Sequence, residues 1–116
     1  MIELKEWWDV ECKILPEESM NYSKVVVITI KNHAPHPRRF KIGVENIQIK
    51  NELNELRLRM YLDICQNPLV IEIDKYKKEE VGIAIPNLSL PEKEGKITIY
   101  VENEHTGERK TFDIYL

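Results

Sequence analysis

The residues with the clearest capacity for metal chemistry are the three histidines of the chain. His33 and His36 have a spacing that can serve a metal ion, and Pro35 and Pro37 hold their loop in an extended conformation. His105 could join them only if its own hairpin lay at the same end of the fold. Because exposed loop histidines are the ordinary case, we expect no metal and no cofactor, and a metal site at the three histidines is kept as an alternative.

No combination of nucleophile, acid and base typical of an enzyme stands out in the sequence. It contains no Gly-rich phosphate loop, no Gly-x-Ser-x-Gly turn and no Cys-x-x-Cys pair. Paired carboxylates such as Glu17-Glu18 and Glu79-Glu80 flank predicted turns, where solvated charges keep a sheet soluble. We therefore expect a protein without catalytic activity.

Large aromatic and planar cationic side chains provide the candidate binding residues. Trp7 and Trp8 are adjacent, so in a strand one points inward and the other outward. Trp8 shares the apolar parity of the residues that follow and is expected in the core, which leaves Trp7 exposed unless a neighbouring loop covers it. Exposed tryptophan is enriched in protein interfaces and on carbohydrate-binding surfaces.

The loop from Asn32 to Arg39 is the second candidate binding element. Its prolines lower the ordering cost of binding, and Arg38 and Arg39 supply charge and planar donors. Otherwise Arg38, Arg39 and Lys41 are simply the solvated start of a strand. We expect this loop to form an ordered, partly exposed rim. The predicted binding residues of the chain are Trp7, His33, His36, Arg38 and Arg39.

The two cysteines, Cys12 and Cys65, could pair only if their strands face each other across the core. Cys12 shares the inward parity of its strand, whereas Cys65 falls off the apolar parity of its segment. Two reduced thiols are expected, as is usual in a cytoplasmic chain, and a Cys12–Cys65 disulfide is the alternative.

Composition limits the class of protein and its surroundings. With 116 residues the chain has the size of a single domain, 1–116, and a net charge of −3 does not favour binding to nucleic acid or to an anionic membrane. No apolar run approaches the roughly 20 residues of a membrane helix, so no membrane insertion is expected. The start lacks a signal-peptide core, so we expect a cytoplasmic protein, or an extracellular one if the chain is an excised domain of a longer exported protein. Abundant Glu, Lys and Ile suggest a thermophilic source.

Short runs of alternating apolar and polar residues, separated by Pro, Gly and Asn, predict an all-β fold. The run 24–31 is rich in β-branched residues and apolar on both parities, which predicts a central strand covered on both faces. A strand from Phe40 changes phase before Ile47, which predicts a bulge near Glu45-Asn46. Residues 50–64 also fit a helix, but alternation over 56–64 favours a strand. Further strands are expected at 2–14, 69–73, 81–85, 97–101 and 112–116, the last two as a hairpin.

Strands of this number and pattern need a second sheet to cover their apolar faces, so the prediction is an antiparallel β-sandwich of about seven to nine strands. Ile85-Pro86, Glu94-Gly95 and the run 97–101 close the chain, and Asn32 and Pro35 follow an early Val/Thr/Ile run. In these features the chain resembles the immunoglobulin-like sandwiches called CARDB and the related Ig-like modules attached to glycosidases. The resemblance implies an immunoglobulin-like fold and a binding, spacer or adhesion module without catalysis, and it assigns no functional residues.

These observations predict a non-catalytic Ig-like β-sandwich that acts through protein–protein contacts, as an assembly subunit or adaptor. Binding of a carbohydrate or surface ligand is the first alternative, and metal binding by the loop histidines is the second. A protein partner or self-association is expected. If the last strand, 112–116, lies at a sheet border, its unpaired backbone invites a homodimer, whereas an internal strand would be paired on both sides.

Overall fold

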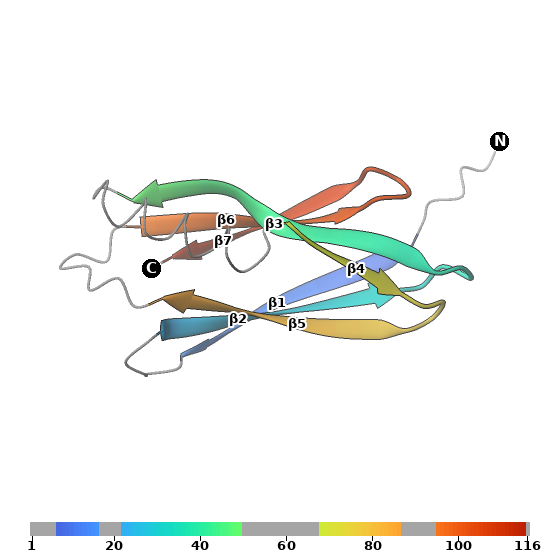
Figure 1. Ribbon diagram of the computed structural model, residues 1–116, viewed down its shortest axis with the longest axis horizontal. Helices are drawn as coiled ribbons and strands as arrows, with labels where there is room; N and C mark the ends of the chain where they lie inside the picture. The colour runs from blue at the N-terminus through green and yellow to red at the C-terminus, as the bar shows by residue number, and fades with distance from the viewer. Residues whose placement is uncertain (1–6, 17–21, 50–67, 87–94, 116) are drawn as a thin grey trace.

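Two antiparallel sheets make up the protein, as a computed structural model of the chain shows for residues 7–16, 22–49, 68–86 and 95–115. All regular structure within these residues is β-strand. The strands are β1 (Trp8–Pro16), β2 (Tyr22–Asn32), β3 (Arg38–Ile49), β4 (Leu69–Ile73), β5 (Lys78–Pro86), β6 (Gly95–Asn103) and β7 (Arg109–Tyr115). Their orders are β1-β2-β5 in one sheet and β4-β3-β6-β7 in the other, and the sheets stack face to face (Figure 1). The predicted all-β sandwich is confirmed.

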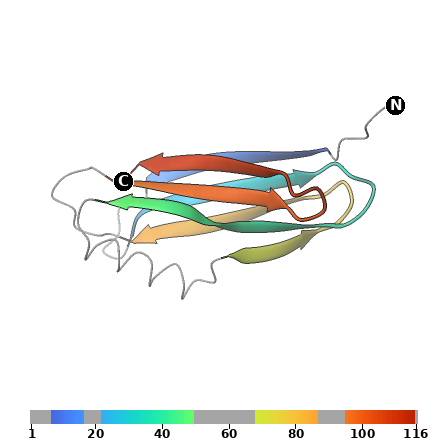
Figure 2. The same cartoon turned by 90° about the horizontal axis from the view of Figure 1, so that it is seen from above.

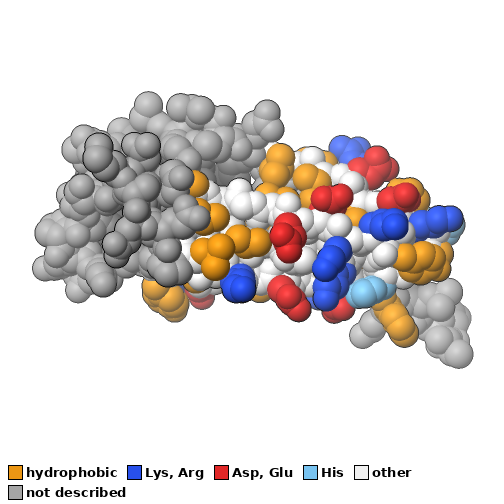
Figure 3. All heavy atoms as spheres, turned by 90° about the horizontal axis from the view of Figure 1, so that it is seen from below, with side chains coloured by type: hydrophobic (Ala, Val, Ile, Leu, Met, Phe, Trp, Pro, Cys, Tyr) orange, Lys and Arg blue, Asp and Glu red, His pale blue; other side chains and the backbone are white. Residues whose placement is uncertain are grey.

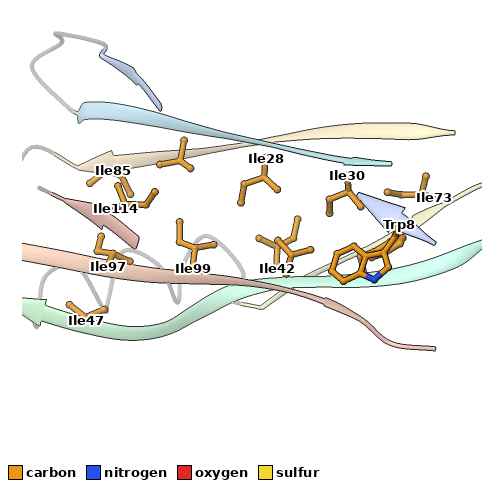
Figure 4. Close-up of a cluster of buried hydrophobic side chains, with 13 residues drawn as sticks. Trp8, Ile28, Ile30, Ile42, Ile47, Ile73, Ile85, Ile97, Ile99 and Ile114 are labelled. Carbon is orange, nitrogen blue, oxygen red and sulfur yellow. The ribbon is translucent and has the colours of Figure 1, made fainter. Parts of the chain in front are cut away.

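The core lies between the inner faces of the two sheets. Ile28, Ile30 and Ile85 project from the three-stranded sheet toward Ile97 and Ile99 of the other (Figure 4). All of these side chains are at most 1% exposed. Each buried isoleucine contributes about 1.5–3 kcal/mol relative to an exposed one, so this row is the main source of stability.

β2 is the central strand of its sheet, as predicted, but it is covered on one face only. Val26, Ile28 and Ile30 are fully buried, whereas Val25 and Val27 on the outer face are half-buried. Gly82 lies opposite Val27 and has no side chain to cover it. The β-branched residues of β2 therefore go with its central position, where it pairs with a strand on each side. The expectation that both of its faces are buried is wrong.

β3 contains the predicted irregularity. Its register with β6 shifts between Val44 and Asn46, so Glu45 is the additional residue of a bulge. Phe40 and Ile42 before the bulge and Ile47 after it are all buried. The bulge thus keeps both halves of a long strand facing the same core.

The remaining predicted strands agree in position, with one difference at β1. β4, β5 and the β6–β7 hairpin are formed where they were expected. Ile14 of β1 was expected to face the core, yet it is 43% exposed, because β1 is an edge strand and this part of it extends to the border of the sandwich. The predicted elements at 2–6 and 50–64 lie outside the described residues.

The sandwich has two flanks formed by edge strands. β1 and β7 lie along one flank, and β4 and β5 lie along the other (Figure 2). The last strand is thus at a sheet border, which was one of the two placements expected for it. Trp8 closes the core at one end, with its ring centroid 5.5 Å from that of Phe40.

Candidate functional site

Three connections meet at the end of the sandwich where β1 begins (Figure 1). They are the loop 33–37 between β2 and β3, the turn 74–77 between β4 and β5, and the hairpin 104–108 between β6 and β7. Together with Arg38 and Arg39, which follow the first loop, we call them the rim. The Asn32 amide donates to the Lys77 carbonyl at 2.9 Å, and the Glu104 amide donates to the Arg39 carbonyl at 3.0 Å. Backbone hydrogen bonds therefore tie the rim to both sheets.

The side chain of Asn32 holds the first rim loop in place. It is 1% exposed, and its Nδ2 group lies within hydrogen-bond distance of the carbonyls of His36 (2.9 Å), Ile73 (3.1 Å) and Asp74 (3.3 Å). Its Oδ1 accepts from the Ala34 amide at 3.0 Å. One buried amide thus connects the loop to the end of β4, and the expected ordered rim is present.

A second buried asparagine has the equivalent place in the hairpin. Asn103 ends β6 as Asn32 ends β2, and its Oδ1 accepts from the His105 amide, two residues on, at 3.0 Å. Both residues thus form local Asx-type turns at the ends of inner strands. The hairpin closes with Gly107 at φ 75°, a conformation that suits glycine.

Trp7 stands exposed beside the rim. Its side chain is 71% exposed, so the alternative in which a neighbouring loop covers it is wrong, while Trp8 is 5% exposed and lies in the core as predicted. The Trp7 carbonyl accepts from the His33 amide at 3.1 Å. The ring is therefore carried by backbone that is hydrogen-bonded to the first residue of the loop that Asn32 orders.

The predicted cationic residues of the rim are partly engaged with the hairpin. Glu104 lies 3.5 Å from the Arg39 side chain and 3.7 Å from that of Lys41. Arg38 donates to the Pro37 carbonyl at 3.2 Å. Arg39 stays exposed, so it remains accessible to a partner, but one acidic residue reduces the local positive charge.

The three histidines lie at the same end of the fold, as the metal alternative required. His33, His36 and His105 are all exposed, and the His33 Nε2 atom lies 2.8 Å from the Asp9 carboxylate. Within the described part of the chain, however, no three His, Cys, Asp or Glu side chains come together as metal ligands would. The metal alternative gains no support from this geometry.

Sequence reasoning missed Tyr76, which is 67% exposed and has a φ of 57°. The Lys77 amide donates to the Asp74 carbonyl at 3.2 Å, so Tyr76 is the third residue of a β-turn. A positive φ at this position is typical of glycine or asparagine and costs about 1 kcal/mol or more for a bulky side chain. Asp74 is a usual first residue of a turn, but the Lys-Tyr-Lys that follows has no glycine or asparagine to mark the positive φ in the sequence.

A second group that the sequence did not reveal lies on the outer face of the four-stranded sheet. The Arg109 guanidinium lies 3.9 Å from the centre of the Tyr100 ring and hydrogen-bonds to Glu45 and Glu102 at 3.2 and 3.1 Å. Tyr100 in turn covers Gly43, where an added Cβ would meet the ring at 2.7–2.8 Å. These contacts are satisfied within the chain, so this group is structural.

Cys12 is a free thiol on the inner side of β1. Partial burial raises the pKa of this thiol above its ordinary value, so it stays protonated near neutral pH. Cys65 lies outside the described residues. The predicted alternative of a Cys12–Cys65 disulfide therefore lies outside them too.

Charges on the outer face of the three-stranded sheet are mixed, with acidic and basic side chains side by side over the half nearer the rim (Figure 3). No helix in the described residues is long and apolar enough to cross a bilayer. No family model matches the chain, and comparisons with curated proteins and with solved structures give no match.

Proposed function

We propose that this protein is a non-catalytic, immunoglobulin-like β-sandwich that binds another protein through its rim, as an assembly subunit or adaptor. The observation that carries the proposal is the buried Asn32 side chain, which fixes the exposed loop 33–37 before any partner arrives. Because an ordered loop loses little conformational entropy on binding, a rim of this kind is suited to recognition.

The residues around this loop have the composition of a protein interface. Trp7 and Tyr76 are large exposed aromatic residues beside the loop and in the adjoining turn, and Arg39 adds a planar cation. Tryptophan, tyrosine and arginine are the residues that most often dominate binding energy in protein interfaces. The positive φ of Tyr76 lowers the stability of the fold, so the presence of tyrosine at this position is consistent with a role in binding.

The immunoglobulin-like part of the proposal is supported by strand order. In immunoglobulin sandwiches of the constant type the first, second, fourth and fifth strands share one sheet, and the third, sixth and seventh share the other. Six of the strands described here divide in the same way, whereas β4 differs because it pairs with β3 at the border of the second sheet. Modules of this architecture commonly bind through the loops at one end, which fits the rim.

The test is a paired measurement on two double variants. A photo-reactive amino acid at position 76 should cross-link the partner in cells and so allow it to be identified. The affinity of this partner for the purified protein and its variants is then measured. Arg38→Ala with Arg39→Ala should weaken binding at least about tenfold while leaving Tm nearly unchanged, because exposed ion pairs contribute little to stability. Lys24→Ala with Lys96→Ala removes the same charge near the opposite ends of β2 and β6, far from the rim, and should leave binding intact. Equal affinity for both double variants would contradict the rim as the contact surface.

Binding of a carbohydrate is a second candidate, favoured by the exposure of Trp7 and Tyr76. Aromatic rings of this kind can stack against the apolar faces of sugars. A glycan array probed with the protein and with Trp7→Ala should show binding that the variant loses. An array without signal for the unaltered protein would count against this candidate.

A further inference from the structure

Among the strands that the structure describes, the four at sheet edges differ in how they are protected against pairing with another chain. β4 has only five residues. β5 carries Glu79 on its inner face, opposite buried Ile30, and β7 carries Lys110 on its inner face, opposite buried Val101. Short edges and inward charges are the usual means of blocking edge-to-edge association. β1 has nine residues, a continuous register with β2 and no inward charge, so it is the least protected edge.

The outward backbone groups of β1 follow from its pairing with β2. The His33 amide donates to the Trp7 carbonyl, so the odd-numbered residues of β1 bond to β2. The even-numbered residues therefore direct their N–H and C=O groups away from the sheet. Lys110 confirms this direction, because its Nζ atom donates to the Trp8 carbonyl at 3.2 Å. In the described part of the chain no such partner is seen for Val10, Cys12 and Ile14.

We propose that the protein forms a two-fold dimer in which β1 pairs antiparallel with β1 of a second copy. This inference deepens the proposed function, because it names the partner for one surface of a protein that acts through protein contacts. Pairing would join the two three-stranded sheets into one continuous sheet. The dimer would use the flank of the sandwich and leave the rim open.

Charge selects one register for this pairing. The outward backbone groups of the two β1 strands can pair only if the two-fold axis passes through a residue position of β1. With the axis at Cys12, Glu11 of each copy lies opposite Lys13 of the other, which gives two attractive pairs. An axis at Glu11 would pair Asp9 with Lys13 but sets Glu11 against Glu11, an axis at Lys13 sets Lys13 against Lys13, and an axis at Val10 sets Glu11 against Asp9. Only the axis at Cys12 gives attractive pairs without a repulsive one. Like charges directly opposite each other are destabilising.

The same register accommodates the apolar residues and the proline. Val10 would face Ile14 of the second copy, covering a half-buried side chain and one that is 43% exposed. Pro16, which has no N–H, would lie opposite Trp8, whose carbonyl already accepts from Lys110. The proline therefore costs the dimer no hydrogen bond.

The structure favours β1 over the C-terminal strand as the pairing edge. The charges of β7 are engaged within the chain, Arg109 with Glu45 and Glu102, and Asp113 with Thr98. No oppositely charged partner is seen for Glu11 or Lys13 among the described residues. We therefore assign the dimer to β1, in preference to pairing through 112–116.

The charge register is tested by light scattering and sedimentation. The unaltered protein should be a dimer at high concentration, and Glu11→Lys or Lys13→Glu alone should weaken the dimer at least about tenfold by placing like charges together. An equimolar mixture of the two variants should dimerise again, because one chain then carries lysine at both positions and faces glutamate at both positions of the other. An effect within one chain cannot produce this rescue, so two variants that stay monomeric when mixed would overturn the register.

A matched pair of proline variants separates the two candidate edges. Cys12→Pro removes an outward N–H from β1, and Thr111→Pro removes one from β7, since the Asn103 amide donates to Glu108 and sets the alternation there. Cys12→Pro should abolish the dimer, Thr111→Pro should not, and Cys12→Ser controls for the side chain. The reverse result would assign the dimer to β7. A protein that stays monomeric up to about 1 mM would overturn the dimer but not rim binding.

Discussion

At the scale of single residues, the two buried asparagines explain why one end of the sandwich is ordered. Asn32 bonds to carbonyls at the end of β4, with a sequence separation of 41 residues for Ile73. The sequence predicted the stiff loop from its prolines and placed Trp7 and Trp8 on opposite faces. It could not predict the role of Asn32, because an asparagine before a loop looks the same whether its amide meets water or a distant strand.

Replacing Asn32 with alanine is expected to lower the free energy of unfolding by about 3 kcal/mol. The variant leaves the buried Ile73 carbonyl and the buried Ala34 amide without their partner, at a cost of about 1–3 kcal/mol each, and two part-buried carbonyls can turn to water. Urea denaturation followed by fluorescence measures the change. Asn46→Ala, at an exposed position in β3, is the control and should change stability by less than about 0.5 kcal/mol. Equal losses for the two variants would contradict the anchoring role of Asn32.

At the scale of elements, alternation predicted most strands because each described strand has one dry face. The phase change in β3 could be predicted for the same reason, since Ile47 falls out of step with Phe40 and Ile42. The exposure of Ile14 could not be predicted, because the pattern of residues within a strand does not show whether that strand lies at a sheet edge. The half-buried outer face of β2 was misjudged because β-branched residues favour strands whether or not they are buried.

Deleting Glu45 is expected to preserve the fold, with a loss of about 1–2 kcal/mol from the altered local bend. The exposed contact of Glu45 with Arg109 adds little to stability. Without this residue β3 becomes a regular strand, and Ile47 still faces the core. Deleting Lys41 instead breaks the alternation between Phe40 and Ile42 and should unfold the protein. Circular dichroism with chemical denaturation distinguishes the two deletions. Unfolding by both would mean that Glu45 is not the additional residue of the bulge.

At the scale of the whole molecule, the two sheets are joined by the core, by the Asn32 side chain at the rim and, on one flank, by the Lys110 cation. Lys110 of β7 places its Nζ atom 4.3 Å from the centre of the Trp8 ring as well as on the Trp8 carbonyl. The stacking of two sheets could be predicted from the number of half-apolar strands. The pairing of edge strands along each flank could not be predicted, because it depends on the strand order, and strand order produces no periodic pattern in the sequence.

Lys110→Met should lower the free energy of unfolding by about 1–2 kcal/mol. The variant keeps the aliphatic stem but loses the cation over the ring and the hydrogen bond to the Trp8 carbonyl. Thermal unfolding at low protein concentration measures the loss without a contribution from self-association. Lys75→Met, in an exposed turn, should leave Tm within error. No difference between these two variants would show that the flank contact contributes nothing.

The contacts of Asn32 have a consequence for how this protein could diversify. Apart from one amide, its side chain bonds to main-chain carbonyls, which every amino acid possesses. Pro35 and Pro37 hold the loop extended, but His36 contributes only its carbonyl, so the side chain at this position can vary while the path of the loop is kept. A chain built in this way separates the part that holds the shape from the part that makes contact, so selection, or a combinatorial library, can retune what the rim recognises without rebuilding the sandwich beneath it.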